Sequence, residues 1–133
     1  LMSMDDVVDH YDEHLHPEMD LGQLVLQISR SKRDVFPVVN LQRELLGVLY
    51  LDDVRGVMFR SELYHRILVA ELMKQAPARL SENDSMDVIV GVFDRTEAWT
   101  LPVVDARGIF KGFIRRSRVH AVYRQLLADM SED

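Results

Sequence analysis

The sequence repeats one apolar pattern at a fixed spacing. A Phe-Pro-Val-Val run in the first half returns as Leu-Pro-Val-Val in the second. Pro37 corresponds to Pro102 and Gly47 to Gly112, so both pairs are 65 residues apart and no gap is needed. The same spacing aligns two apolar stripes: Leu21, Leu24, Val25 and Ile28 with Met86, Ile89, Val90 and Phe93. The chain is therefore predicted to contain two copies of one supersecondary unit.

Each half has a helix, two strands and a second helix, with a short strand expected in front. In the first half we expect a helix over 20–33 capped by Asp20, strands over 36–39 and 45–51, and a helix from Val54 to about Arg66. In the second half we expect a helix over 84–94, strands over 101–104 and 109–114, and a helix with the stripe Val119, Val122, Tyr123, Leu126 and Leu127. The short turns between the strands predict antiparallel hairpins. Each copy is thus β-α-β-β-α, and the fold class is α/β.

The repeat also predicts the domain organisation. We expect an N-terminal arm over 1–14, which is a short helix or ordered segment, repeats over 15–66 and 67–128, and a frayed tail over 129–133. Neither repeat is long enough for a good core of its own, so each should cover an apolar sheet face of the other as a pseudo-twofold pair.

Composition excludes several classes of protein. The chain has 133 residues and a net charge of −6, which disfavours nonspecific nucleic-acid binding. It has no cysteine, which rules out disulfides and thiolate metal sites. No apolar run approaches the roughly 20 residues that span a bilayer, and no leader is present. We expect a soluble segment, compatible with a piece of a larger membrane protein.

Few residues outside the repeat pattern suggest chemistry. His10, His14 and His16 lie among carboxylates, and a metal site or a solvated polar segment would both fit, the second being favoured. His65 and His120 have no nucleophile at a catalytic spacing, so no enzyme is expected. Trp99 precedes a core strand and is expected to pack there, with a ligand-stacking role as the alternative.

The repeated motifs resemble the tandem CBS-domain pair, or Bateman module, from about Leu15 to about Leu127. The marks are Pro-Val-Val on the first core strand, glycine on the second, and Val-Ala-Glu-Leu-Met at 69–73 opening the second repeat. Residues 31–39, 47–55, 98–104 and 111–114 are similar to the cytoplasmic C-terminal CBS pair of bacterial chloride channel proteins. The resemblance implies a regulatory module with two clefts between the repeats for adenine nucleotides such as AMP, ADP or ATP. It also implies a homodimer formed through the helices, including Val119, Val122 and Leu126, and a membrane-embedded channel domain as partner.

In this family the nucleotide motif is glycine, then Thr or Ser, then Asp, whose carboxylate accepts both ribose hydroxyls. In the first repeat the resemblance places Tyr50 at the hydroxyl position and Asp53 at the ribose position, with the backbone near Val35 and Phe36 as neighbours. Tyr50 keeps a hydroxyl but is far bulkier, so it would stack on a base or fill the cleft.

The second repeat departs from the motif, because Arg115 and Arg118 occupy the two ligand positions. A guanidinium has no acceptor for a ribose hydroxyl but binds phosphate or carboxylate well. Two interpretations stay open here: an anion site, or a solvated basic patch.

Three functions are compatible with this sequence. The first is the regulatory module of a chloride channel or transporter, acting by population shift. The second is a CBS pair from another host, such as a cation transporter or a metabolic enzyme. The third is a structural dimerisation module without ligand.

Overall fold

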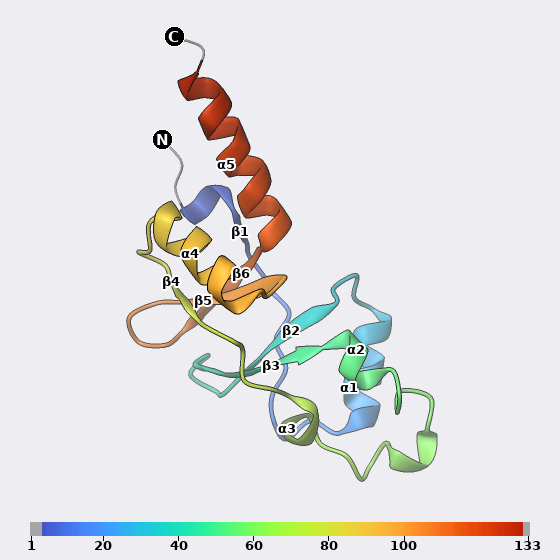
Figure 1. The fold of residues 1–133 in the computed structure, drawn as a ribbon. Coiled ribbons are helices and arrows are strands. Elements are labelled where there is room, and N and C mark those ends of the chain that lie inside the picture. The colour runs from blue at the N-terminus through green and yellow to red at the C-terminus, as the bar shows by residue number, and fades with distance from the viewer. Residues whose placement is uncertain (1–3, 132–133) are drawn as a thin grey trace. The chain divides into compact units, whose positions relative to one another are not determined.

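The computed structural model describes residues 4–131 and divides them into two compact units (Figure 1). Residues 12–75 form the first unit. Residues 4–11 join residues 76–131 in the second. These limits differ from the boundaries predicted at 14/15 and 66/67, and residues 1–3 and 132–133 of the predicted arm and tail lie outside the described part.

The first unit is built on one antiparallel hairpin. Its elements are α1 (Leu21–Ser29), β2 (Val35–Val39), β3 (Leu45–Tyr50), α2 (Leu51–Val54), the 3-10 helix η2 (Ser61–Leu63) and α3 (Val69–Leu72). The predicted capping box is confirmed: the Asp20 carboxylate accepts from the Gln23 N–H, and the Gln23 side chain accepts from the Asp20 N–H, both at 2.9 Å. This cap fixes the start of α1.

The second unit contains the larger sheet. Its elements are the 3-10 helix η1 (Met4–Asp6), β1 (Val8–Asp9), β4 (Leu80–Ser81), α4 (Met86–Thr96), β5 (Thr100–Val104), β6 (Phe110–Arg115) and α5 (Arg116–Met130). The strand order is β1-β6-β5-β4, with β4 parallel to β5 and the other pairs antiparallel. Mixed strands and helices confirm the α/β class.

The strand pairings of the two units are the same: each paired residue of the first hairpin has its counterpart 65 residues later in the second. Leu15 bridges Val38 in parallel in the first unit, as Leu80 pairs with Val103 in the second. The hairpin registers also agree, including the irregularity between the last two residues of β2 and of β5. The predicted internal repeat is therefore confirmed.

Each hairpin is completed by the N-terminal segment of the other repeat. In the first unit Lys74 and Val48 exchange two backbone hydrogen bonds of 2.8 Å. At the corresponding place in the second unit, Asp9 pairs with Phe113. The segment predicted as an arm thus contributes a strand, and this exchange explains why the compact units differ from the sequence repeats.

The two repeat glycines lie where the exchanged segments approach. An added Cβ at Gly112 would lie 2.6 Å from the Asp9 carbonyl oxygen. At Gly47 it would lie 3.0 Å from the Lys74 carbonyl oxygen. Real Cβ atoms do not come as close to backbone as the approach at Gly112 would require, and the contact at Gly47 would be tighter than most. Glycine therefore leaves room for the extra strand at both places.

Each unit has its own buried apolar cluster, with matching positions at the same spacing. The first contains Leu15, Leu21, Leu24, Phe36, Val38, Leu49, Val54 and Val69. The second contains Met4, Val7, Leu80, Ile89, Phe93, Leu101, Val103, Ile114 and Val119. The exchanged segments also contribute to these clusters: Val69 belongs to the first and Met4, the residue that corresponds to it, belongs to the second.

The helix predicted from Val54 to about Arg66 is wrong. α2 ends at Val54, and beyond it only the three residues of the 3-10 helix η2 are helical, although the corresponding α5 has fifteen. The chain turns back because it supplies acceptors to the start of α1: the Leu21 N–H donates to the Ile67 carbonyl at 2.8 Å, and the Gly22 N–H donates to the Tyr64 carbonyl at 3.1 Å. These bonds satisfy amides that a helix N-terminus leaves unpaired.

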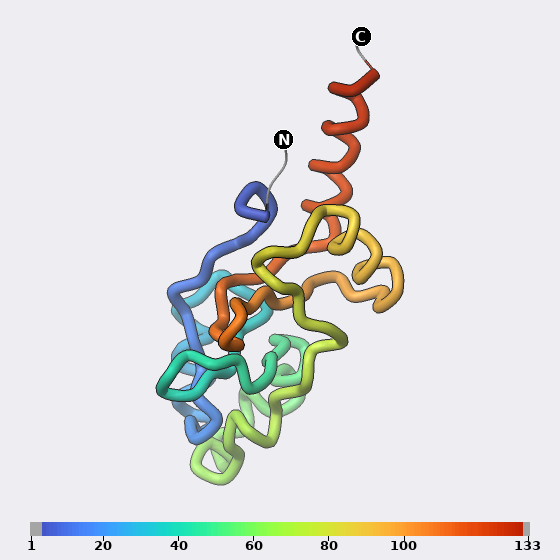
Figure 2. The backbone as a smooth tube through the Cα atoms, turned by 90° about the vertical axis from the view of Figure 1, so that its left-hand side faces the viewer, coloured from blue at the N-terminus to red at the C-terminus, as the bar shows by residue number. Residues whose placement is uncertain are grey.

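The second half of α5 projects beyond the other elements of its unit in both views (Figures 1 and 2). Its apolar side chains are exposed to different degrees. Leu127 is 50% exposed and Met130 is 67% exposed, whereas Val119 near the start is fully buried in the core of its own unit.

Replacing Gly112 with Ala should destabilise the protein by about 1–3 kcal/mol, because the new methyl group overpacks against the Asp9 carbonyl. Gly91, in the middle of α4, has no atom within 4 Å of an added Cβ. Gly91→Ala should therefore stabilise the protein by roughly 0.5–1 kcal/mol. Urea unfolding of both variants measures the difference, and equal effects would contradict the close approach.

Replacing Thr100 with Val should raise stability by about 1 kcal/mol, because a buried hydroxyl without a hydrogen bond costs free energy. Thr100 is 2% exposed, and its hydroxyl has no partner among residues 4–131. The first repeat has Val35 at the same place. Thr96→Val is the control, since the Thr96 hydroxyl donates to the Val92 carbonyl at 2.8 Å and its loss should not stabilise. Thermal unfolding that ranks the two variants the other way would refute the assignment.

Candidate functional site

Asp53 lies in α2, directly after the last strand of the first hairpin. Its carboxylate accepts a hydrogen bond from the Lys74 ammonium at 3.1 Å. The Asp53 side chain is 29% exposed and the Lys74 side chain is 62% exposed. The pair is thus accessible to a ligand, and the carboxylate is an acceptor held in place by a cation.

The other residues predicted for this site divide into two groups. Tyr50 ends β3 opposite Val35 and is half-buried. Burial, and then the nearby Asp53 carboxylate, raise the pKa of Tyr50 further above its usual value, which already keeps the phenol protonated at neutral pH. Val35 and Phe36 are fully buried. Their side chains therefore belong to the core and are not an exposed lining.

Sequence reasoning missed Lys74, although a signal for it existed. Val69 to Met73 were recognised as opening the second repeat, and Lys74 follows them directly. The missing step was that this segment pairs with β3 of the first repeat, which places the Lys74 ammonium against Asp53.

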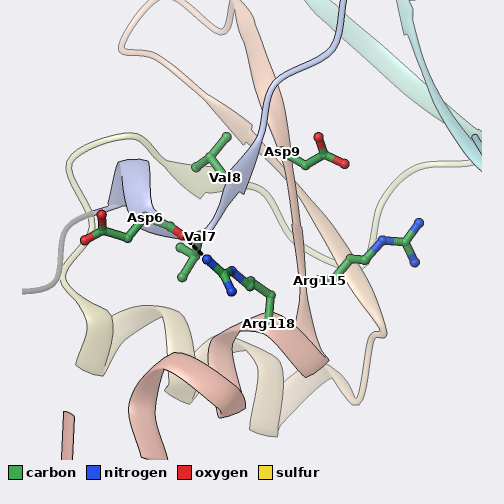
Figure 3. Close-up of a pocket in the computed structure, with 6 residues that line it drawn as sticks. All are labelled: Asp6, Val7, Val8, Asp9, Arg115 and Arg118. Carbon is green, nitrogen blue, oxygen red and sulfur yellow. Dashed lines mark hydrogen bonds between the residues drawn. The ribbon is translucent and has the colours of Figure 1, made fainter. Parts of the chain in front are cut away.

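The corresponding place in the second unit is a cavity of about 310 Å³ (Figure 3). It is lined by Asp6, Val7, Val8, Asp9, Arg115 and Arg118. The Arg118 guanidinium donates to the Asp6 carbonyl at 3.2 Å. The two predicted arginines therefore line one cavity, which Asp6 and Asp9 also line. Asp6 contributes its backbone carbonyl to Arg118, and its side chain points away from the arginines (Figure 3).

Trp99 does not pack into the core as predicted. It is 45% exposed, and the Arg115 guanidinium carbon lies 5.1 Å from the centre of its ring. This is a cation–π contact, which orients Arg115 at the edge of the second-unit cavity.

The histidines of the N-terminal region contact backbone. His16 Nδ1 lies 3.0 Å from the Val39 carbonyl oxygen, and His10 Nδ1 lies 3.2 Å from the Lys111 carbonyl oxygen. Burial, and then the nearby Arg43 and His16, lower the pKa of His14. Within residues 4–131 no three His, Asp or Glu side chains form a group suited to a metal ion.

Comparison with known proteins identifies the architecture. A family model described as the CBS domain matches residues 4–60. A CBS-domain-containing protein of unknown function from Bacillus anthracis str. Ames Ancestor aligns with a TM-score of 0.80 at 17% identity, over 93% of this chain and 94% of that one. The chain has the fold of a CBS-domain pair.

Two further solved structures with this fold contain nucleotides. CBSX2 of Arabidopsis thaliana, in complex with AMP, aligns with this chain with a TM-score of 0.73 at 21% identity, over 92% of this chain and 96% of that one. CbpB in complex with c-di-AMP aligns with a TM-score of 0.75 at 15% identity, over 99% of this chain and 91% of that one.

A search of curated proteins gave no match. No helix within the described residues is long and apolar enough to cross a membrane.

The two equivalent positions of this chain carry opposite charges. In the first unit an acid, Asp53, stands after the hairpin and a base, Lys74, comes from the exchanged segment. In the second unit the base Arg118 stands after the hairpin and the acid Asp9 comes from the exchanged segment. The two places therefore cannot bind the same ligand group in the same way.

Proposed function

We propose that this CBS pair is a non-catalytic regulatory module that binds an adenine nucleotide at Asp53. The observation that carries the proposal is a partly exposed carboxylate directly after β3, next to a neutral tyrosine hydroxyl and a lysine. The AMP and c-di-AMP complexes of proteins with this fold support the choice of ligand class.

The chemistry of Asp53 suits a ribose. A carboxylate accepts two hydroxyl hydrogen bonds, and charge-assisted bonds of this kind are about twice as strong as neutral ones. Tyr50 adds a hydroxyl that is protonated at neutral pH, as tyrosine hydroxyls ordinarily are, and that can donate. Arg118 offers no acceptor at the equivalent place, so a nucleoside should prefer the Asp53 position.

The second-unit cavity suits a small anion rather than a nucleotide. Arg115 and Arg118 would hold a phosphate or sulfate, but the acidic Asp9 in the same lining would weaken the attraction. We therefore propose one nucleotide per chain, with an anion at the arginines as a separate and weaker event.

The host we propose is a chloride channel or transporter, with the module on the cytoplasmic side of its membrane domain. The support is the set of motifs around both hairpins that resemble the CBS pair of bacterial chloride channels. Nucleotide-dependent chloride flux of the complete protein in vesicles tests this host. A cation transporter or a metabolic enzyme as host would show no such flux, and a structural dimerisation module would show no nucleotide binding.

Asp53→Ala should abolish or strongly weaken nucleotide binding. Losing a charged acceptor costs roughly 1.5–3 kcal/mol, which is more than tenfold in affinity. Isothermal titration with AMP, ADP and ATP measures the loss. Asp52→Ala is the matched control, since Asp52 is 80% exposed and pairs with Arg55.

Arg118→Ala should leave nucleotide affinity nearly unchanged. Binding that survives Asp53→Ala and disappears with Arg118→Ala would reverse the assignment. A protein that binds none of the three nucleotides would favour the structural module.

We also propose a homodimer that uses the exposed end of α5. Val119 does not contribute, because it is buried in its own unit, and the predicted Val122 packs against the same core. Partly buried Leu126 and exposed Leu127 and Met130 follow on the projecting half of the helix. Exposed apolar side chains in a row on one helix are typical of an interface.

Leu127→Glu should convert the dimer into a monomer, because a carboxylate would be buried against apolar side chains. Light scattering at tens of micromolar protein measures the mass. Ala121→Glu adds the same charge at an exposed position nearer the start of α5 and should leave the dimer intact. A monomeric wild-type protein would exclude this interface.

A further inference from the structure

The ion pair at Asp53 gives the candidate site a property beyond ribose recognition. Lys74 is held by its backbone, since its N–H donates to the Val48 carbonyl and its carbonyl accepts from the Val48 N–H, both at 2.8 Å. Its ammonium reaches the Asp53 carboxylate at 3.1 Å and is otherwise largely exposed. The Lys74 backbone is therefore fixed, while its ammonium group is largely exposed and can move.

A lysine ammonium has three donor hydrogens, and the bond to Asp53 uses one of them. A ribose diol brings no charge and needs only the carboxylate. A phosphate joined to that ribose brings negative charge, and a flexible ammonium beside the diol acceptor is positioned to neutralise it. The pair thus offers an acceptor for the sugar and a donor for the phosphate.

The opposite charges of the second unit support this division. There the exchanged segment carries Asp9 in place of Lys74, and Arg118 stands in place of Asp53. A nucleotide placed there in the same orientation would meet a carboxylate near its phosphate. Lys74 is thus a feature of one site and not of the repeated frame.

We propose that Lys74 is the phosphate-binding residue of the Asp53 site and makes it select nucleotides over nucleosides. This inference rests on the proposed nucleotide function. Its ligand class is a ribonucleotide with a phosphate on the ribose that Asp53 holds. Lys74 would shift from Asp53 toward the phosphate without moving the backbone, since its pairing with Val48 does not involve the side chain.

The test compares AMP with adenosine by isothermal titration, in wild-type protein, Lys74→Met, Lys74→Arg and Lys111→Met. Lys74→Met should weaken AMP about tenfold or more, as expected for loss of a charge-assisted bond, and change adenosine by less than about threefold. Lys74→Arg should keep most of the preference for AMP. Lys111→Met removes a lysine that lies 3.8 Å from Asp105 and should change neither affinity.

Two results would overturn the inference while leaving the proposed function intact. One is AMP binding that Lys74→Met weakens no more than Lys111→Met does. The other is an equal loss for AMP and adenosine, which would mean that Lys74 only positions Asp53. Wild-type protein that binds neither compound, or binds AMP without depending on Asp53, would instead reject the proposed function and the inference with it.

Discussion

The rest of the structure depends on the backbone pairing between each hairpin and an N-terminal segment from the other repeat. A two-stranded hairpin is marginal by itself, and the added segment supplies both hydrogen bonds and core side chains. In the first unit Lys74 pairs with Val48, and glycine at position 47 gives the approaching carbonyl room. The same contact carries the Lys74 ammonium to Asp53, so folding and the candidate site share one interaction.

The two repeats share the same backbone pairing but differ in their charged side chains. Bridges, hairpin registers and glycine positions agree at one spacing throughout the two units. The polar residues at the ends of the hairpins do not: Asp53 faces a lysine, whereas Arg118 lines a cavity with Asp9. Backbone hydrogen bonds constrain the frame through main-chain groups common to all residues. The exposed residues that follow each hairpin lack that constraint, so their side chains can differ in charge between the two repeats.

The first half also shows how tertiary hydrogen bonds override helical periodicity. The spacing of Val54, Val57 and Met58 suits a helix, and the corresponding residues of α5 form one. In the first unit the chain instead returns to the start of α1, where amides of Leu21 and Gly22 need acceptors. Satisfying those amides outweighs the weak preference for a longer helix that contains Gly56.

The sequence by itself determined the local features. The repeat, both hairpins, the Asp20 capping box and the position of Asp53 after β3 all follow from residues close together in the chain. Only the tertiary structure decided the exchange of segments, the pairing of Lys74 with Asp53, the burial of Val119 and the exposure of Trp99. The physical reason is the separation along the chain of the residues that interact. Periodicity and caps depend on neighbours within a few residues, whereas strand partners and charge pairs depend on which distant segments pack together.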